Sequence, residues 1–319
     1  MDPSAHIELP LSGLRIGHAH DPVVRTGVTV VVPDRPAVCA VDIRGGGPGT
    51  RETDTLALGG LIERVHAIVL AGGSVYGLAA ADAVCRDLGA RGIGFVAGPP
   101  PVPVSPIVPA AILFDNANGG DKDWGAAPPF RALGHDALDT ASRMTGEGSV
   151  GAGYGATAGI YRGGFGIASE TVGQVTVCAM IAANPVGSPF LPGTRVPHAW
   201  IYECDNEFGG IRPPDDYQWT PPQDTKLARF AQAGRNTVIG VVATDAALSP
   251  SDLKRLAIMA QDGLALSVQP SHTPLDGDTL FALSLEVKEI ETPATLSLLG
   301  AAAARTVARA LTRGVLAAG

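Results

Sequence analysis

The feature that most constrains the fold of this chain is an uncharged run, Val238 to Val242, three quarters of the way along its 319 residues. Apart from Gly240, every residue of the run is β-branched. An apolar run of this kind is typical of a strand buried on both faces, whereas a strand with one solvated face alternates polar and apolar residues. We therefore expect this strand to lie inside the core.

Thr237 stands directly before this run and follows Asn236. If the chain were cut between the two, Thr237 would carry a hydroxyl nucleophile and a free α-amine that can act as its base. The competing interpretation is an ordinary strand residue, because threonine is common in strands. The stretch alone favours the ordinary interpretation, so the decision depends on the rest of the sequence.

The composition is that of a compact globular protein. Hydrophobic residues make up 45% of the chain and charged residues 17%, which argues against a disordered chain. The length permits about two domains or one large α/β unit. A net charge of -8, together with only 5% aromatic residues, argues against a nucleic-acid partner.

No apolar segment reaches the roughly 18 residues of a membrane helix without interruption, so we expect no membrane partner. The first residues, Met1 to His6, lack the basic and apolar regions of a secretory signal. A cytoplasmic location is therefore expected.

Neither a metal nor an organic cofactor is expected. The four cysteines lie far apart in apolar segments, which predicts buried free thiols rather than a zinc site or a disulfide framework; they are Cys39, Cys85, Cys178 and Cys204. The segment Gly151 to Ala156 matches the loose dinucleotide-binding pattern. That pattern requires a strand directly before it, and the sequence predicts a helix there instead.

Hydrophobic periodicity indicates strands and helices in alternation along the chain. Further strands are predicted over 27–32, 37–43, 65–70, 110–114, 164–170, 174–183, 198–204 and 280–287. Helices are predicted over 74–89 and 129–144 and from about residues 249 and 294, with a short helical stretch over 226–232. The first two of these strands are interpreted as a hairpin, because the residues between them form a proline-rich turn.

Three loops have the composition of binding or catalytic loops. Residues 44–54 are glycine-rich and flanked by arginines that could hold a carboxylate, although a tight structural connection explains them equally well. At 71–74 a glycine turn leads from a strand into a helix, with Ser74 as the expected N-cap and Tyr76 in the first turn. Asn184 ends a strand just before a proline, which leaves its side-chain amide free.

Six short stretches follow one another over nearly the whole chain. They are Arg44-Gly45-Gly46 with Gly49, Gly72-Gly73-Ser74-Val75-Tyr76-Gly77, Gly151-Ala152-Gly153 with Gly159, Asn184-Pro185-Val186-Gly187, Asn236-Thr237, and Asp276-Gly277-Asp278-Thr279. In this order they resemble the self-processing L-aminopeptidase D-amidase/esterases. That family includes β-peptidyl aminopeptidases and endo-type 6-aminohexanoate-oligomer (nylon oligomer) hydrolases.

The resemblance implies a single catalytic domain over residues 1–319 with an αββα fold, in which two central sheets lie between layers of helices. This fold is similar to that of ornithine acetyltransferase and the N-terminal nucleophile hydrolases. The resemblance also implies a precursor that cuts itself between Asn236 and Thr237, giving an α chain of residues 1–236 and a β chain of residues 237–319. The Asn-Thr pair and the Asp-Gly-Asp-Thr loop resemble the nylon-oligomer hydrolases more closely than aminopeptidases that are cut at Gly-Ser.

Under this resemblance the residue types fit definite roles. Thr237 Oγ would attack the Asn236 carbonyl, and the amine freed by cleavage would later accept the Oγ proton. Asn184 would donate to the developing oxyanion, and the Tyr76 hydroxyl would add to the same oxygen or to the substrate. The other positions are Asp278 and Asp276, which would hold the threonine amine and hydroxyl, and Gly73, Ser74 and Gly153, which would contact substrate.

One position departs from the family pattern. Members usually have a lysine directly after the glycine-rich stretch 151–159, where this chain has Ile160. Arg162 lies two positions further on, but a guanidinium stays protonated and cannot act as a base in place of the lysine. Either the role of the lysine is dispensable or filled elsewhere, or the protein processes poorly.

The sequence thus predicts an autoprocessed amide hydrolase that acts on small peptides, amino-acid amides or amide oligomers such as 6-aminohexanoate oligomers. The apolar C-terminal helix must be covered by a sheet or a neighbouring subunit. The resemblance also implies assembly, because members of the family form oligomers. Together with this apolar helix, it gives an expected homotetramer of αβ units. Two alternatives stay open: an acyltransferase on the same scaffold, and an uncleaved, inactive relative.

Overall fold

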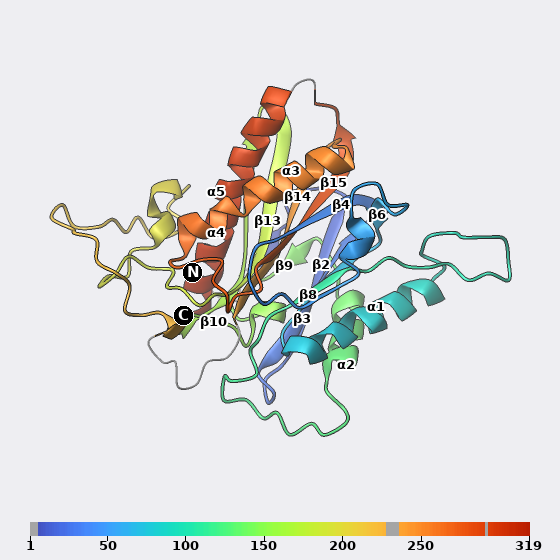
Figure 1. Cartoon of the computed structure of the whole chain (residues 1–319), viewed down its shortest axis with the longest axis horizontal. Coiled ribbons are helices and arrows are strands. Elements are labelled where there is room, and N and C mark those ends of the chain that lie inside the picture. Colours follow the sequence, from blue (N-terminus) through green and yellow to red (C-terminus); the bar gives the residue numbers. More distant parts are fainter. Residues whose placement is uncertain (1–5, 228–235, 291–292) are drawn as a thin grey trace.

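Two sheets lie face to face in the structure, a computed structural model that describes residues 6–227, 236–290 and 293–319 (Figure 1). The six-stranded sheet contains, in spatial order, β12 (Gly164–Val172), β13 (Val175–Asn184), β14 (Thr237–Ala246), β15 (Thr279–Lys288), β4 (Ala37–Ile43) and β6 (Arg64–Val65). The five-stranded sheet contains β2 (Leu14–Asp21), β3 (Thr26–Pro33), β7 (Ile68–Ala71), β8 (Ala110–Ile112) and β5 (Thr50–Arg51). Two short strand pairs join β1 (Ile7–Glu8) to β9 (Met144–Thr145) and β10 (Thr157–Ala158) to β11 (Tyr161–Arg162).

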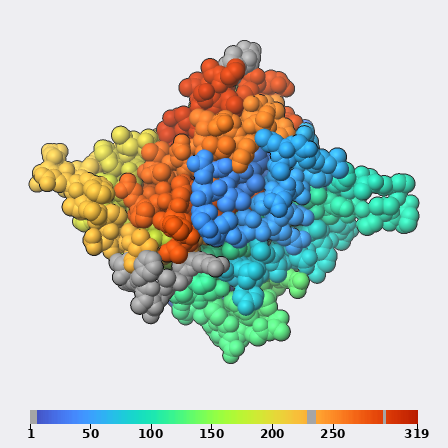
Figure 2. Space-filling view, in the orientation of Figure 1, coloured from blue at the N-terminus to red at the C-terminus, as the bar shows by residue number. Residues whose placement is uncertain are grey.

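Helices cover the outer face of each sheet. The six-stranded sheet packs against α3 (Pro250–Ala260), α4 (Asp262–Ser267) and α5 (Pro293–Ala318), and the five-stranded sheet against α1 (Ala79–Ala90) and α2 (Phe130–Asp139). Short 3₁₀ helices are η1 (Asp54–Leu56), η2 (Ser74–Leu78), η3 (Gly151–Gly153) and η4 (His198–Tyr202). The predicted αββα arrangement is therefore confirmed. Segments far apart in sequence meet at the surface, where Figure 2 shows the N-terminal part in blue beside the C-terminal part in orange.

Strand β14 runs through the middle of the six-stranded sheet, antiparallel to β13 and parallel to β15. All of its residues are buried. Ile239 and Val241 lie in the core between the two sheets, whereas Val238 and Val242 lie in the core between the sheet and its helices. The burial on both faces expected from its composition is confirmed.

The predicted hairpin over residues 27–43 is wrong. Strand β3 belongs to the five-stranded sheet, where it pairs with β2 and β7, and β4 belongs to the other sheet, where it pairs with β15. The proline-rich turn crosses from one sheet to the other. The predicted strand 65–70 is divided in the same way between β6 and β7. Buried β-branched runs specify a strand but not its partner, because both sheets are covered on both faces.

Two local predictions are also wrong. The segment 198–204 is not a strand, since residues His198–Tyr202 form the 3₁₀ helix η4. Ser74 is not an N-cap, because it has a φ of 55° inside η2, and α1 begins only at Ala79 with Leu78 at the cap position. The glycine turn therefore enters the helix through one extra 3₁₀ turn.

Other predictions are confirmed. Strands β12 and β13 form an antiparallel pair, and α3 begins after Ser249, whose Oγ accepts the Asp252 amide at 3.2 Å. The C-terminal helix is α5, and its apolar face lies on β12 and β13 of the same chain. Most of the predicted helical stretch 226–232 lies outside the described residues.

Within the described ranges, no helix is both long and apolar enough to cross a membrane. The four cysteines are free. Cys39 and Cys178 are buried and Cys85 is half-buried, but Cys204 is exposed, so the prediction of buried thiols is wrong at that position.

Candidate active site

The candidate site lies where three segments meet at one end of the six-stranded sheet. Thr237, the first residue of β14, is paired across the antiparallel ladder with Asn184, the last residue of β13. On its other side, Asn236 forms a parallel bridge with Asp276, in the loop that leads into β15. The fold thus brings together three stretches that the sequence singled out separately.

The peptide bond between Asn236 and Thr237 is held by the backbone of Gly277. The Gly277 amide donates to the Asn236 carbonyl oxygen at 3.0 Å and to Thr237 Oγ at 3.1 Å. The Thr237 hydroxyl itself donates to the same carbonyl oxygen. A Cβ on Gly277 would lie 2.8 Å from Thr237 Oγ, so glycine is required for this close approach.

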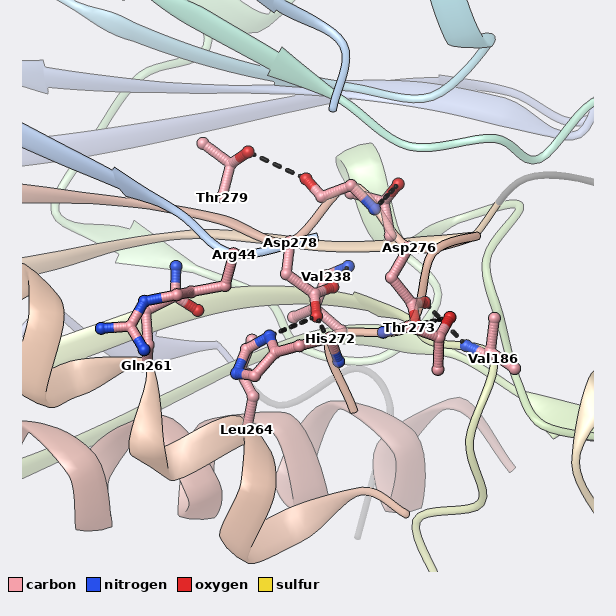
Figure 3. A network of polar contacts seen from close by, with 12 residues as sticks. Arg44, Val186, Val238, Gln261, Leu264, His272, Thr273, Asp276, Asp278 and Thr279 are labelled. Atoms are coloured by element: carbon pink, nitrogen blue, oxygen red, sulfur yellow. Dashed lines mark hydrogen bonds and ion pairs between the residues drawn. The ribbon is translucent and has the colours of Figure 1, made fainter. Parts of the chain in front are cut away.

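Asp278 is buried and its carboxylate is fully engaged (Figure 3). Its Oδ1 accepts the Val238 amide at 2.8 Å, and its Oδ2 accepts from His272 Nδ1 at 2.8 Å and from the His272 amide at 3.1 Å. Burial lowers the pKa of His272, but the hydrogen bond and charge of Asp278 outweigh it, and the net pKa is raised. Asp278 therefore contacts the residue after Thr237.

Asp276 fixes the shape of the same loop (Figure 3). Its Oδ1 accepts the Val186 amide at 3.0 Å, and its Oδ2 accepts the Thr273 amide at 3.0 Å and the Thr273 hydroxyl at 2.5 Å. Burial, and next the charge of Asp278, raise the pKa of Asp276. This carboxylate ties the loop before β15 to the segment after Asn184.

The glycine-rich loop from Arg44 to Gly47 braces the Asp276–Asp278 loop from outside. The Arg44 amide donates to the Asp278 carbonyl at 2.9 Å, and the Gly47 amide donates to the Asp276 carbonyl at 2.8 Å. A Cβ on Gly45 would lie 2.4 Å from the Asp276 carbonyl oxygen. The Arg44 guanidinium is paired with Asp42 within the chain, at 2.7 Å. The structural interpretation of this loop is the one that its contacts support.

Asn184 links the two sheets. Its Nδ2 donates to the carbonyl of Phe114, just after β8, at 3.0 Å. Its Oδ1 accepts the Thr157 amide at 2.9 Å and Lys226 Nζ at 3.2 Å. The side-chain amide expected to be free is thus held on both sides, although among the described residues one N–H of its NH₂ group has no acceptor.

The turn that carries Gly73 and Ser74 lies beside residues 113–115, the segment after β8 to which Asn184 is bonded. The Gly73 amide donates to Asp115 Oδ1 at 2.7 Å, and the Ser74 amide donates to the Leu113 carbonyl at 2.9 Å. Tyr76 is 49% exposed and its ring contacts Trp124 at 5.4 Å between centroids. Among the described residues, no hydrogen bond joins Tyr76 to Thr237.

Gly153 occupies a different environment. Its amide donates to the Val150 carbonyl at 2.9 Å, and a Cβ at this position would lie 2.2 Å from the Phe165 nitrogen on β12. This glycine permits close packing of η3 against the sheet, so its contacts explain it without a substrate.

Sequence reasoning missed three participants. His272 and Gly277 lie in the loop already singled out for its aspartates, so their place before a buried strand was the available signal. Lys226 had no such signal, since it stands at the start of the short helical stretch predicted over 226–232. Burial lowers the pKa of Lys226 to about 7, although the charge of Asp276 acts in the opposite direction.

Known structures share this architecture. A β-aminopeptidase from a Burkholderia species superimposes with a TM-score of 0.69 and 22% identity, covering 98% of this chain and 89% of its own. The L-aminopeptidase D-Ala-esterase/amidase from Ochrobactrum anthropi, described as a variant of the N-terminal nucleophile hydrolase fold, gives a TM-score of 0.70 at 21% identity, covering 99% and 89%. The fold of this chain is therefore similar to the N-terminal nucleophile hydrolase fold.

The sequence profile of Peptidase family S58 matches residues 10–319, and the chain belongs to this family. An uncharacterized aminopeptidase of Mycobacterium tuberculosis is 42% identical over 96% of this chain and 92% of its own length. A 6-aminohexanoate-oligomer endohydrolase of a Kocuria species is 33% identical over 89% of this chain and 75% of its own. The protein is accordingly a hydrolase that acts on amide bonds.

Proposed function

We propose that the protein is an autoprocessing amide hydrolase whose nucleophile is Thr237. The observation that carries the proposal is the contact of the Thr237 hydroxyl with the Asn236 carbonyl, held by the Gly277 amide. Attack of Oγ on the carbonyl carbon breaks the peptide C–N bond and forms an ester, and the Oγ proton goes to the leaving nitrogen. This cleavage frees the Thr237 amine, and water then hydrolyses the ester, which releases the Asn236 carboxylate and restores the Thr237 hydroxyl.

In the mature enzyme the freed α-amine takes the Oγ proton when Thr237 attacks a substrate amide. The remaining N–H of Asn184 and the Gly277 amide are the proposed donors to the oxyanion, because both lie beside Thr237. Asp276 and Asp278 hold the loop that carries Gly277. Asp278 Oδ1 accepts the amide of Val238, the residue after Thr237, at 2.8 Å, so after cleavage it is the carboxylate proposed to pair with the new Thr237 amine.

The proposed substrates are small peptides, amino-acid amides or amide oligomers. The support is the naming of two sets of relatives, as aminopeptidases and as 6-aminohexanoate-oligomer endohydrolases. Gly73, Ser74 and Tyr76 are the proposed substrate-contact residues, since their turn borders the segment bonded to Asn184. A homotetramer of αβ units is proposed from family resemblance alone, because the apolar face of α5 is already covered by its own sheet.

Trapping of the acyl intermediate tests this function. The mature protein is mixed with an amino-acid ester, quenched in acid within seconds, and the β chain is weighed by mass spectrometry. We expect a β chain heavier by one acyl group, with the group mapped to Thr237. Transfer of the acyl group only when an acceptor amine is added would indicate an acyltransferase instead. An unmodified β chain during steady turnover would contradict the proposed nucleophile.

A further inference from the structure

We propose that Lys226 is a positioning residue of this site, which orients the Asn184 carboxamide so that its NH₂ group faces the reacting carbonyl. This inference rests on the proposed function, since it concerns the donor to the oxyanion. The lysine lies shortly after the polar, proline-rich residues 207–223, and nothing in the hydrolytic scheme above uses it.

The contacts of the ammonium group determine the orientation of the amide. Lys226 Nζ lies 3.2 Å from Asn184 Oδ1 and 3.2 Å from the Asn184 backbone oxygen. An ammonium group only donates hydrogen bonds, so the side-chain oxygen of Asn184 must face it. The Thr157 amide donates to the same oxygen. With two donors on Oδ1, Nδ2 is directed the other way, toward the Phe114 carbonyl, on the face of the sheet that Asn184 shares with its ladder partner Thr237.

The segment that carries Lys226 is fixed in place on both sides. The Lys226 amide donates to the Val186 carbonyl at 3.0 Å. Two residues earlier, Asp224 Oδ2 accepts the Ser188 hydroxyl at 2.6 Å and the Tyr161 hydroxyl at 2.8 Å. These bonds hold residues 224–226 against the segment that follows β13 and against β11. The lysine therefore reaches Asn184 from a backbone segment that is already held in place, as a positioning residue requires.

The same segment lies on the backbone of Ile160. The Ile160 amide donates to the Asp224 carbonyl at 3.0 Å, and a Cβ on Gly159 would lie 2.4 Å from that oxygen. The Ile160 side chain is 44% exposed and does not fill the site. An amine is thus delivered to Asn184 from the segment adjacent to position 160. This contact gives a structural answer to the absence of a lysine at that position.

The charge of Lys226 adds a second, measurable property. Burial lowers the pKa of its ammonium to about 7, against the opposing charge of Asp276. The acidic groups around it are Asp276, with Asp278 beyond it in the same loop, and Asp224 on its own segment, whose Oδ2 is occupied by two hydroxyl donors. The Asn184 oxygen therefore loses a charge-assisted bond as the pH rises through neutrality.

The test compares Lys226→Met and Lys226→Arg with wild type in the full-length, self-processed protein. Removing an oxyanion donor outright costs about 10²- to 10³-fold in kcat, so loss of its positioning group is expected to cost roughly tenfold or more. We expect Lys226→Met to lower kcat at nearly unchanged KM. Lys226→Arg, which stays charged at every working pH, is expected to recover part of the rate.

The pH profile distinguishes positioning from a purely structural role. Wild type is expected to show an alkaline limb that starts near neutrality, and both variants are expected to lack it. Lys288→Met is the matched control. Lys288 lies at the end of β15 away from the site, where it pairs with Asp245 of β14, so its replacement should leave the pH profile unchanged. Wild-type kcat and an unmoved alkaline limb in Lys226→Met would overturn the inference. Cleavage of wild type between Asn236 and Thr237 in the same preparations shows that the proposed function itself stands.

Discussion

At the scale of single residues, the site depends on buried polar groups that are hydrogen-bonded within the described chain. Thr237, Asn184, Asp276 and Asp278 are all buried, and each has bonds to more than one neighbour or to a backbone amide. Burying such groups is favourable only when they are paired, so the site is ordered before a substrate arrives. Under the proposed function, the reactivity of Thr237 follows from the position in which its hydroxyl is held.

The pair of His272 and Asp278 predicts a pH-dependent stability. Because the pKa of His272 is raised on folding, its contribution is fully present below its unfolded value of about 6.5. The contribution is lost as the pH rises through the folded pKa. His272→Gln is therefore expected to lower the free energy of unfolding by about 1 kcal/mol at pH 6 and by less at alkaline pH.

Urea unfolding of the uncleaved Thr237→Ala protein, with and without His272→Gln, measures this difference at each pH. Using the uncleaved background avoids irreversible separation of the chains. A difference that stays constant between pH 6 and pH 9 would show that the histidine is not charged in the folded protein.

At the scale of elements, the loop before β15 is held in place by the glycine loop that leads out of β4. Gly45→Ala places a Cβ 2.4 Å from the Asp276 carbonyl oxygen, so the loop must shift. We expect a loss of roughly 1–3 kcal/mol in stability, as for overpacked sites, and slower self-cleavage. The time course of chain cleavage after refolding measures the second effect.

Gly47→Ala is the matched control in the same loop. A Cβ on residue 47 would lie 3.8 Å from its nearest neighbours, which is ordinary contact. The hydrogen bond from the backbone amide of residue 47 to the Asp276 carbonyl is kept. Cleavage at the wild-type rate in Gly47→Ala, with slowed cleavage in Gly45→Ala, is the expected pattern. Equal rates in the two variants would mean that close packing of the loops is unimportant for processing.

The sequence predicted elements better than their partners. The composition of β14 was sufficient to predict burial on both faces, and the Ser249 cap was sufficient to start α3. The partners of β3 and β4 were mispredicted because local sequence carries no information about which of two covered sheets a strand joins. Of the site, the resemblance named Thr237 and its neighbours, but Lys226 could be found only from the fold.

At the scale of the whole molecule, the proposed cut divides one continuous core. Strand β14 pairs with β13 from Val177–Thr244 to Asn184–Thr237, and β15 pairs with β4. Residues on both sides of the cut therefore pack together in the core between the two sheets and in the core between the six-stranded sheet and its helices. The orange and red C-terminal part in Figure 1 lies among strands of the N-terminal part.

The two chains are accordingly expected to stay together after cleavage. In native buffer they should sediment as one particle with a mass that is a multiple of 32.5 kDa, four times for the proposed tetramer. Only denaturant should separate them. Two separate peaks in native buffer would contradict the shared core, and a single particle of 32.5 kDa would rule out the tetramer while leaving the association of the chains intact.

The most direct test of the central claim is the intact mass of the purified protein beside that of Thr237→Ala, with Thr237→Ser as the variant that keeps a hydroxyl. We predict that wild type gives two masses, for residues up to Asn236 and from Thr237 onward, and that Thr237→Ser gives the same division. Thr237→Ala is predicted to remain one chain of 32.5 kDa. A wild-type protein that stays whole, or a Thr237→Ala protein still cut at this bond, would contradict the assignment of Thr237 as the nucleophile.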